Sequence, residues 1–349
     1  MNRGKPQKFD QLAGKIRLLT GPDGEKLPSE RELARRFGCS HLTVRKALKN
    51  LAASDAVHAV PGKGWYAGPD DSTRGMADQI GFMFPDDEIF YYRIFAQVER
   101  VTASNGLHPV VHLTGGSVEK ENQLLDYFGQ LHIQALIAVP NRLCAEHYRH
   151  LKIPVLFFDM RLPELGIPQI VSDDYSGART AVEQLIGLGH VRIAHIGSEY
   201  DYTGEQRLNG YLDALHQSGL PASRQLIKMR YPSREWGYHA ARELFELKRP
   251  PTAIFCANDT IAAGVVNFCA DRGIGIPEEL SVIGFGNTPT AEYLNLNSVS
   301  QNQNKISGAI CTNLRNLLSG AEIPPLTMIP TTYVARKTVQ APRTRGRKR

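Results

Sequence analysis

The sequence predicts an α/β protein in which a small helical head with a β-hairpin precedes a large body of parallel sheets. Two observations carry this prediction. Residues 8–68 combine three stretches of helical apolar spacing with two short apolar strands, and residues 79–337 alternate short apolar strands with helical patterns. The chain has 349 residues, enough for two or three domains at roughly 150 residues each.

The first two helices of the head are marked by apolar spacing and by signals that end helices. Apolar residues within 12–19 follow a helical repeat, and the stretch 20–26 then breaks the chain with glycine and proline. The second helix is predicted to begin after Ser29, which forms a capping box with Glu32 three residues later. We expect this helix to end at Gly38, where a positive φ is often needed.

The third helix, 40–54, begins at Ser40 and carries an apolar stripe opposite a polar and basic face. Two short strands, within 56–60 and 65–68, then flank a turn at 61–64 that contains two glycines. Helix, tight turn, helix and hairpin together are the layout of the winged helix-turn-helix. The alternative is an ordinary three-helix unit with the same stripes and caps.

Charge is distributed unevenly along the chain, whose formal net charge is +6. Residues 1–68 carry +7 and residues 338–349 carry +5, whereas residues 69–337 carry −6. A basic end on an acidic body is what binding to a phosphate backbone favours. The alternative is a solvated surface with a basic tail.

A winged helix-turn-helix with these charges predicts a binding site for double-stranded DNA. The first turn of the third helix, which has short polar side chains, is expected to enter the major groove. Phosphates are expected to be held by Arg31, Lys46 and Lys49 and by backbone amides at helix starts. In the wing turn, Gly62 allows close backbone approach and Lys63 supplies charge.

The head closely resembles the DNA-binding domain of the GntR family through the string LPSERELARRFGCSHLTVRKALKNLAASDAVHAVPGKGWYAG. The resemblance implies that DNA is contacted by Arg31, Ser40, His41, Thr43, Arg45, Gly62 and Lys63. His41 and Leu42 stand where other members often carry Arg or Thr, so the family does not provide the base preference.

The body is joined to the head by a polar stretch, 69–78, that is predicted to be a linker. Its strands are expected at QIGFMF, HPVVHL, ALIAVP, VLFFD, RIAHIG, LIKM, AIFCAN and SVIGFG. Such alternation indicates parallel sheets covered by helices on both faces, with ligands at the carboxyl ends of the strands.

No enzyme motif is complete in the body. Residues 284–289 lack the last glycine of the dinucleotide fingerprint, and P-loop, HExxH and G-x-S-x-G motifs are missing from the sequence. The five cysteines form no C-x-x-C pair, and the histidines show no metal-ligand spacing. We therefore expect neither an enzyme nor a cofactor or metal site. The sequence also has no secretory signal and no apolar run near the roughly 18 residues of a membrane span, which predicts a cytoplasmic protein.

The body strongly resembles the effector-binding domain of the LacI/GalR regulators, which is related to periplasmic sugar-binding proteins. The resemblance is carried by IVSDDYSGARTAVEQLIGLGHVRIAHIG, by EQRLNGYLDALHQSGL and by PPTAIFCANDTIAAGVVNFCADRGIGIPEELSVIGFGN. It implies two periplasmic-binding-protein-like lobes of parallel sheets that are linked by three crossovers. One lobe would comprise 79–172 and 299–320, the other 173–298 and 321–337, with a basic tail at 338–349.

The same resemblance places a small-molecule effector in the cleft between the lobes. It implies effector contacts by Phe90, Tyr91, Asp173, Arg207, Asn258, Asp259 and Asn287. Gly286 stands where an Asp is common, which removes one expected acceptor for a sugar hydroxyl. Arg207 has the alternative role of a salt bridge between the lobes.

A GntR-type head on a LacI-type body is similar to chimeric bacterial regulators of the arabinose-repressor type. We therefore expect a ligand-responsive transcriptional regulator, a homodimeric repressor of carbohydrate-use genes whose affinity for an inverted-repeat operator depends on a small sugar. The alternatives are a non-sugar effector such as a purine, and an activator. A sugar-binding transport-type protein or a pyridoxal-dependent fusion enzyme is disfavoured.

Overall fold

The computed structural model describes residues 8–22, 24–52, 54, 56–60, 62–68, 79–131, 133–199 and 202–343. Two compact units make up the chain, a head that ends at residue 79 and a body that comes after it. The predicted linker, 69–78, and residues 344–349 of the predicted tail lie outside the described residues. The α/β fold class that the sequence predicts is confirmed.

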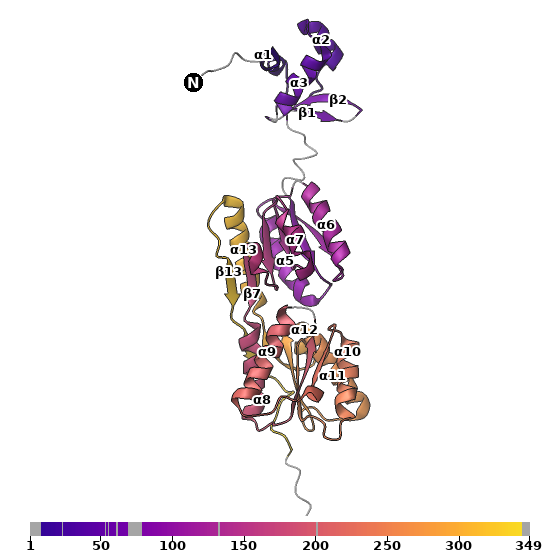
Figure 1. Ribbon diagram of the computed structural model, residues 1–349, viewed down its shortest axis with the longest axis vertical. Helices are drawn as coiled ribbons and strands as arrows, with labels where there is room; N and C mark the ends of the chain where they lie inside the picture. The colour runs from indigo at the N-terminus through magenta and orange to yellow at the C-terminus, as the bar shows by residue number, and fades with distance from the viewer. Residues whose placement is uncertain are drawn as a thin grey trace, which may run out of the picture. The chain divides into compact units, whose positions relative to one another are not determined.

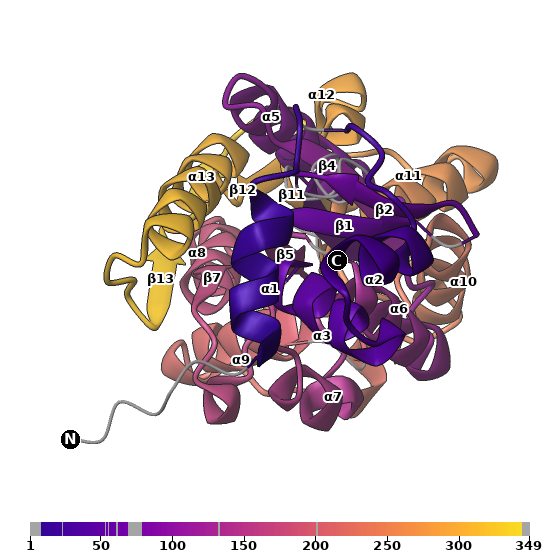
Figure 2. The same ribbon diagram turned by 90° about the horizontal axis from the view of Figure 1, so that it is seen from above.

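The described residues of the head form three helices and a two-stranded antiparallel hairpin. Helix α1 packs beside α3, and the two helices lie side by side in Figure 2. The elements of the head are α1 (Lys8–Arg17), α2 (Glu30–Phe37), α3 (His41–Ala52), β1 (Val57–Val60) and β2 (Gly64–Ala67).

Local sequence signals fix the ends of α2. The Ser29 hydroxyl accepts a hydrogen bond from the Glu32 amide at 3.3 Å, and the Glu32 carboxylate accepts one from the Ser29 amide at 2.7 Å. This is the predicted capping box. Gly38 comes directly after the helix with a φ of 61°, which only glycine adopts without strain. The apolar faces of the three helices then bury a common core that includes Ile16, Leu33 and Leu48.

The body consists of two lobes, each built on a six-stranded sheet (Figure 1). The first-lobe sheet has the order β13-β7-β6-β5-β3-β4, and its strands are covered by α5, α6, α7 and α13. The elements of the first lobe are β3 (Gln79–Phe84), α5 (Ile89–Ala103), β4 (His108–Leu113), α6 (Val118–Gln130), β5 (Ala135–Ala138), α7 (Ala145–Arg149), β6 (Val155–Phe158), β7 (Gln169–Ser172), α13 (Gln303–Ser319) and β13 (Leu326–Ile329).

The second-lobe sheet has the order β14-β12-β11-β10-β8-β9, and only β14 is antiparallel to its neighbour. Figure 1 shows α8 and α9 on one side of this sheet and α10 and α11 on the other. The elements are α8 (Asp174–Gly187), β8 (Ile193–Ser198), α9 (Tyr202–Gln217), β9 (Ile227–Arg230), α10 (Arg234–Phe245), β10 (Ala253–Cys256), α11 (Asp259–Arg272), β11 (Ser281–Gly286), α12 (Pro289–Tyr293), β12 (Asn297–Ser300) and β14 (Thr332–Val334).

Buried apolar strands explain why both sheets are parallel and covered on two faces. Every residue of β5, β6 and β10 is buried, as expected for strands that pack against helices on both sides. In each lobe the strand order reverses beside the first strand, β3 or β8. Ligands of such sheets bind at the carboxyl ends next to this reversal.

Three crossovers connect the lobes, and hydrogen bonds tie them to one another. The Asp173 amide donates to the carbonyl of Ile329 at 2.8 Å, and the Thr331 hydroxyl donates to the carbonyl of Asp173 at 3.2 Å. The Gln301 amide nitrogen donates to the Ser172 hydroxyl at 3.0 Å. The three connecting segments therefore form one hinge.

The third crossover lies later in the chain than the sequence indicated. Residues 321–337 were expected in the second lobe, but β13 pairs in parallel with β7 of the first lobe. The chain returns to the second lobe only between β13 and β14. The alternating pattern of the sequence does not reveal which sheet a late edge strand joins, because edge strands of both lobes are equally short and partly exposed.

The predicted basic tail also begins too early. Thr338 donates a hydrogen bond to the Val282 carbonyl, and the Gln340 amide donates to the Ser281 hydroxyl at 3.2 Å. Gln340 also accepts a hydrogen bond from Ser281 at 3.1 Å. Residues 338–340 therefore belong to the second lobe.

Replacing Gly264 by alanine is expected to destabilise the second lobe by about 1–3 kcal/mol, because α10 and α11 pack backbone against backbone. A β-carbon at Gly264 would collide with the carbonyl oxygen of Arg234, and one at Gly237 with that of Ile261. The control is Gly308→Ala in α13, where a β-carbon meets nothing within 4 Å. Urea unfolding measures both variants, and equal effects would contradict this account of the helix pair.

Candidate functional site

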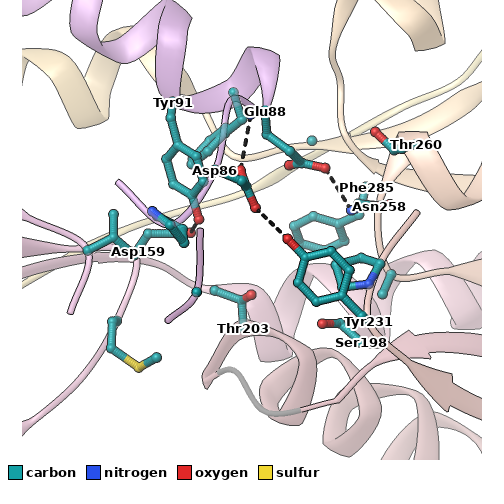
Figure 3. A pocket seen from close by; sticks show the side chains of 18 of the residues that line it. Asp86, Glu88, Tyr91, Asp159, Ser198, Thr203, Tyr231, Asn258, Thr260 and Phe285 are labelled. Atoms are coloured by element: carbon teal, nitrogen blue, oxygen red, sulfur yellow. Dashed lines mark hydrogen bonds between the residues drawn. The ribbon is translucent and has the colours of Figure 1, made fainter. Parts of the chain in front are cut away.

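A cavity of about 350 Å³ lies between the two lobes, at the carboxyl ends of their strands. Loops from both sheets contribute to it, and Figure 3 shows how their side chains face one another. The volume is at the lower end of the range for small-molecule sites. Residues that line it include Asp86, Glu88, Phe90, Tyr91, Asn141, Asp159, Thr203, Arg207, Tyr231, Asn258, Asp259, Thr260, Phe285 and Gln301.

Aromatic rings give the cavity an apolar wall. Tyr91 stacks on Phe84 of β3 with ring centroids 5.7 Å apart, and its hydroxyl donates to the Asp159 carboxylate at 2.9 Å. Phe285 lies at the end of β11, and Tyr231 comes directly after β9. Both lobes therefore supply aromatic surface as well as polar groups.

Arg207 of α9 is buried and held on three sides. Its guanidinium lies 2.7 Å and 2.8 Å from the Asp174 carboxylate and donates to the Ala257 carbonyl at 2.7 Å. It also lies 4.0 Å over the ring of Phe285. Asp174 opens α8, so this salt bridge lies within the second lobe and not between the lobes. The arrangement fixes the guanidinium at the cavity wall.

Two carboxylates of the first lobe accept hydrogen bonds from the second lobe. The Tyr231 hydroxyl donates to Asp86 at 3.3 Å, and the Asn258 amide donates to Glu88 at 3.1 Å (Figure 3). Asp86 also accepts a hydrogen bond from the backbone amide of Glu88 at 3.0 Å. The loop between β3 and α5 therefore contacts the opposite wall of the cavity directly.

Burial changes the protonation of two cavity carboxyls. Burial raises the pKa of Glu88 to about 7, and the neighbouring Asp86 carboxylate adds to the rise. Burial also raises the pKa of Asp259 to about 6, although Ser298 and Thr288 donate hydrogen bonds to it. The Ser298 and Thr288 bonds, at 2.7–2.9 Å, hold Asp259 at the start of α11.

Glu88→Gln is expected to raise the unfolding temperature at pH 8 by about 2–4 °C and to have little effect at pH 5. The pKa of Glu88 is raised when the protein is folded, so the folded state binds the proton more tightly than the unfolded state does. Stability from this group therefore increases as the pH falls from about 7 towards the ordinary carboxyl value. Asp86, Arg207 and Asp259 face Glu88 and stay unchanged in the variant. A difference that is the same at both pH values would contradict the assignment.

Five of the seven residues expected to contact the effector line the cavity, namely Phe90, Tyr91, Arg207, Asn258 and Asp259. The other two do not. Asp173 accepts a hydrogen bond from the Ser176 amide at 3.1 Å and so caps α8. Asn287, with a φ of 49°, accepts a hydrogen bond from Arg336 at 2.7 Å. The Asp173 side chain therefore bonds to local backbone and the Asn287 side chain to Arg336, and other residues line the cavity.

Several lining residues were missed although the sequence marks them. Asp86 lies just beyond the strand QIGFMF, and Asp159 directly succeeds VLFF. Tyr231 lies just beyond β9 in the same way. Because ligands bind at the carboxyl ends of parallel strands, polar residues just after each predicted strand were the signal. Gln301 was not predictable in this way, because β12 was not among the expected strands.

The head presents a second candidate site on the surface of α3. Arg31, Ser40, His41, Arg45 and Lys46 are exposed. In the hairpin turn Gly62, with a φ of 74°, and Lys63 are exposed as well. Thr43 is partly buried, and its amide donates a hydrogen bond to the Ser40 hydroxyl at 3.2 Å, so Ser40 caps α3. The Thr43 and Ser40 hydroxyls also bond to each other at 2.8 Å.

Glu30 of α2 connects the exposed face of α3 with the hairpin. Arg45 donates to its carboxylate at 3.2 Å, and Trp65 of β2 donates to it at 3.1 Å. The His41 imidazole lies 2.6 Å from the same carboxylate. Although burial opposes the change, hydrogen bonds from Trp65 and Arg45 lower the pKa of Glu30. Glu30 therefore fixes two of the candidate DNA-contacting side chains.

Leu42 is an unexpected member of this surface. It lies in the first turn of α3 with 68% of its surface exposed, next to His41. An exposed apolar side chain at the start of a recognition helix can contact the methyl group of thymine. The sequence pattern showed only that Leu42 lies off the apolar stripe.

Comparisons with known proteins match the head and the body separately. Residues 9–67 match the model for bacterial regulatory proteins of the gntR family, and residues 182–339 match the periplasmic binding protein-like domain. The transcriptional regulator GalR of Escherichia coli is 30% identical over 279 residues, which cover 76% of this chain and 81% of GalR. The chain belongs to the LacI/GalR family of transcriptional regulators. As expected, this family member is a regulator and not an enzyme.

Two further relatives of this LacI/GalR-family regulator are named as repressors. The probable transcriptional repressor ExuR of Bacillus subtilis is 36% identical over 180 residues, which are 50% of this chain and 54% of ExuR. The match therefore spans about half the length of ExuR. The arabinose metabolism transcriptional repressor of Geobacillus stearothermophilus is 27% identical over 281 residues, 76% of each chain.

Solved structures share the fold of this regulator. The transcription regulator CcpA of Lactococcus lactis has a TM-score of 0.70 at 21% identity, over 76% of this chain and all of that one. A LacI-type regulator from Alkaliphilus metalliredigens, complexed with D-xylulofuranose, has a TM-score of 0.67 at 24% identity, over 75% and 99% of the two chains. In the described part of this regulator, no helix has the length and apolar character needed to cross a membrane.

Proposed function

We propose that this regulator is a cytoplasmic, homodimeric repressor of carbohydrate-use genes whose effector is a small sugar. The sugar occupies the cavity between the lobes, and its binding changes the affinity of the head for an inverted-repeat operator. The observation that carries the proposal is the cavity, which combines aromatic rings with carboxylate, amide and guanidinium groups at the carboxyl ends of two sheets.

The composition of the cavity suits a sugar. A pyranose has an apolar face of C–H groups, which packs on aromatic rings, and a rim of hydroxyls, which both donate and accept hydrogen bonds. Tyr91 of the first lobe and Tyr231 of the second lobe provide ring surfaces. Asp86 and Glu88 accept hydrogen bonds, and Arg207 is fixed as a donor.

The names of the related proteins point in the same direction. One relative is a repressor of arabinose metabolism, and two solved structures of similar fold hold D-xylulofuranose and cellobiose. The structure with cellobiose, of the regulator CelR, covers 96% of this chain with a TM-score of 0.70 and 20% identity. We carry over the class of ligand and not any one sugar.

For the DNA side of the proposal, α3 is the recognition helix. His41, Leu42 and Arg45 would contact base edges in the major groove, with Ser40 and Thr43 at its first turn. Arg31, Lys46 and the wing residues Gly62 and Lys63 would contact phosphates. A dimer must place its two recognition helices about one turn of DNA, or a multiple of it, apart.

Closure of the lobes on the sugar is the proposed link between the two sites. The three crossovers form the hinge about which the lobes would move. They are joined by hydrogen bonds such as the one from Gln301 to Ser172. A shift of the dimer interface would then change the spacing of the two heads. Coupling of about 1–3 kcal/mol would change operator affinity about 5–150-fold.

Two measurements on the full chain test the proposed function. A thermal-shift panel of pentoses, hexoses, their phosphates and purines identifies the effector class. Selection of bound duplexes from a random library, followed by anisotropy titration, identifies the operator. The proposal requires that at least one sugar raises the unfolding temperature. It also requires that the duplexes selected from the library share an inverted repeat. A purine as the only stabilising compound, or no duplex bound at low ionic strength, would contradict it.

A further inference from the structure

The wall of the cavity carries many more acidic than basic side chains. Among the described residues that line it, the basic ones are Arg142 and Arg207. The acidic ones are Asp86, Glu88, Glu121, Asp159, Glu199 and Asp259. A molecule bound there therefore faces more carboxyl groups than guanidinium groups, and both lobes contribute carboxyls.

The two guanidinium groups offset only part of this excess of carboxylates. Arg207 is neutralised by Asp174, whose carboxylate lies 2.7 Å away and is fully buried beside it. Arg142 is at the mouth of the cavity with 61% of its side chain exposed, and its nearest carboxylate, Glu205, is 3.8 Å away. Solvent screens a charge in that position.

Asp86 and Glu88 are the carboxylates placed to select a ligand by charge. They come from one loop of the first lobe, and each accepts a hydrogen bond from a neutral donor of the second lobe, Tyr231 or Asn258. Asp259 and Glu121, in contrast, are used inside their own lobes. Asp259 accepts hydrogen bonds from Thr288 and Ser298, and Glu121 accepts them from Tyr148 and Asn141.

A ligand that enters between the lobes takes the place of these neutral donors. Above pH 7, where Glu88 is ionised, the ligand must present hydroxyl or ammonium groups to Asp86 and Glu88, because carboxylates act only as acceptors. A carboxylate or phosphate on the ligand would present acceptors and negative charge to the same two groups.

We infer that the effector of this regulator is a polyhydroxylated molecule without negative charge, a neutral or amino sugar, and that Asp86 and Glu88 exclude uronates and sugar phosphates. The inference rests on the proposed function and deepens it, because it specifies the charge class of the sugar. A single like-charge contact at 4 Å corresponds to about 10- to 1000-fold weaker binding in a partly buried site.

The test is calorimetry on the full chain at pH 8, where Glu88 is ionised. The ligands are glucose and galactose, each as the neutral sugar, the 2-amino sugar, the uronate and the 6-phosphate, together with neutral pentoses and pentose 5-phosphates. We expect the tightest ligand to be neutral or cationic and to bind at least about tenfold more tightly than its anionic counterpart at low salt. A uronate or phosphate that binds most tightly overturns this inference and leaves a sugar effector standing. Absence of binding by every compound overturns both the inference and the sugar effector.

The variant pair Asp86→Asn with Glu88→Gln tests the assignment to these two residues. Removing both charges should reduce the preference for the uncharged sugar by about tenfold or more. The matched control is Asp271→Asn with Glu278→Gln, which removes two carboxylates outside the cavity and should leave the preference unchanged. A preference that survives in the first variant, or is lost equally in the second, contradicts the role of Asp86 and Glu88.

Discussion

Arg207→Ala is expected to lower the free energy of unfolding of the body by about 3–5 kcal/mol and to abolish the response to the effector. The reason is that the fully buried Asp174 carboxylate loses the guanidinium that lies 2.7 Å away. The hydrogen bond that Ser172 donates to it at 2.8 Å does not replace this charge. Urea unfolding and calorimetry with the effector measure the two losses.

The control for Arg207 is Arg179→Ala in the same lobe. Arg179 pairs with Glu183 at 2.8 Å, but its side chain is 36% exposed and solvent screens the pair, so its removal should affect stability much less than the removal of Arg207. The double variant Arg207→Ala with Asp174→Asn should recover part of the lost stability, because it also removes the buried negative charge that faced the guanidinium. Strictly additive losses in the double variant would show that the pair does not act as a unit.

Arg45→Ala is expected to abolish specific operator binding and to leave the affinity for the effector unchanged. A bidentate contact from arginine to a base contributes about 1–3 kcal/mol of discrimination, and Arg45 is presented from the exposed face of α3 by Glu30. Anisotropy with the selected operator and with an unrelated duplex separates specific from non-specific affinity.

Two further variants distinguish base reading from charge in this experiment. Arg45→Lys keeps the positive charge but loses the planar pair of donors. Its affinity for the selected operator should therefore be lower than that of the natural chain. Lys49→Ala on the same helix should weaken binding to both duplexes equally. It should also reduce the salt dependence of the affinity by about the contribution of one phosphate contact. Retained discrimination by Arg45→Ala would contradict the assignment of α3 as the recognition helix.

Much of the fold can be predicted from local signals in the sequence. The capping box at Ser29 and Glu32 and the apolar stripe of α3 are decided by neighbouring residues, and the structure has both. Strands with continuous apolar runs, such as β6 and β10, are equally easy to predict from the sequence, because both of their faces are buried.

Two of the strands that the sequence did not reveal, β7 and β12, contain buried polar residues. β12 has the sequence Asn-Ser-Val-Ser, and all four residues are buried. Ser298 donates to Asp259, and Asn297 bonds with Thr338. These partners lie about 40 residues away in the chain. A hydropathy pattern cannot show that distant partners satisfy such a strand, so β12 looked like a loop.

The position of the cavity could be predicted from the sequence, but only some of the residues that line it could. Arg207, Asn258 and Asp259 were found through the family resemblance, whereas Asp86 and Asp159 could have been found only from their positions just past the ends of β3 and β6. Asp173 shows the limit of both approaches. It lies at a crossover, where capping α8 and contacting a ligand both favour an aspartate, and the structure has it capping the helix.

The most direct test of the whole account is the affinity for the selected operator, measured by anisotropy without and with a saturating concentration of the sugar that stabilises the protein. Occupancy of the cavity is predicted to change the dissociation constant about 5–150-fold, in either direction. A sugar that demonstrably binds but leaves operator affinity the same within about twofold would show that the cavity and the head are not coupled, and would contradict the account.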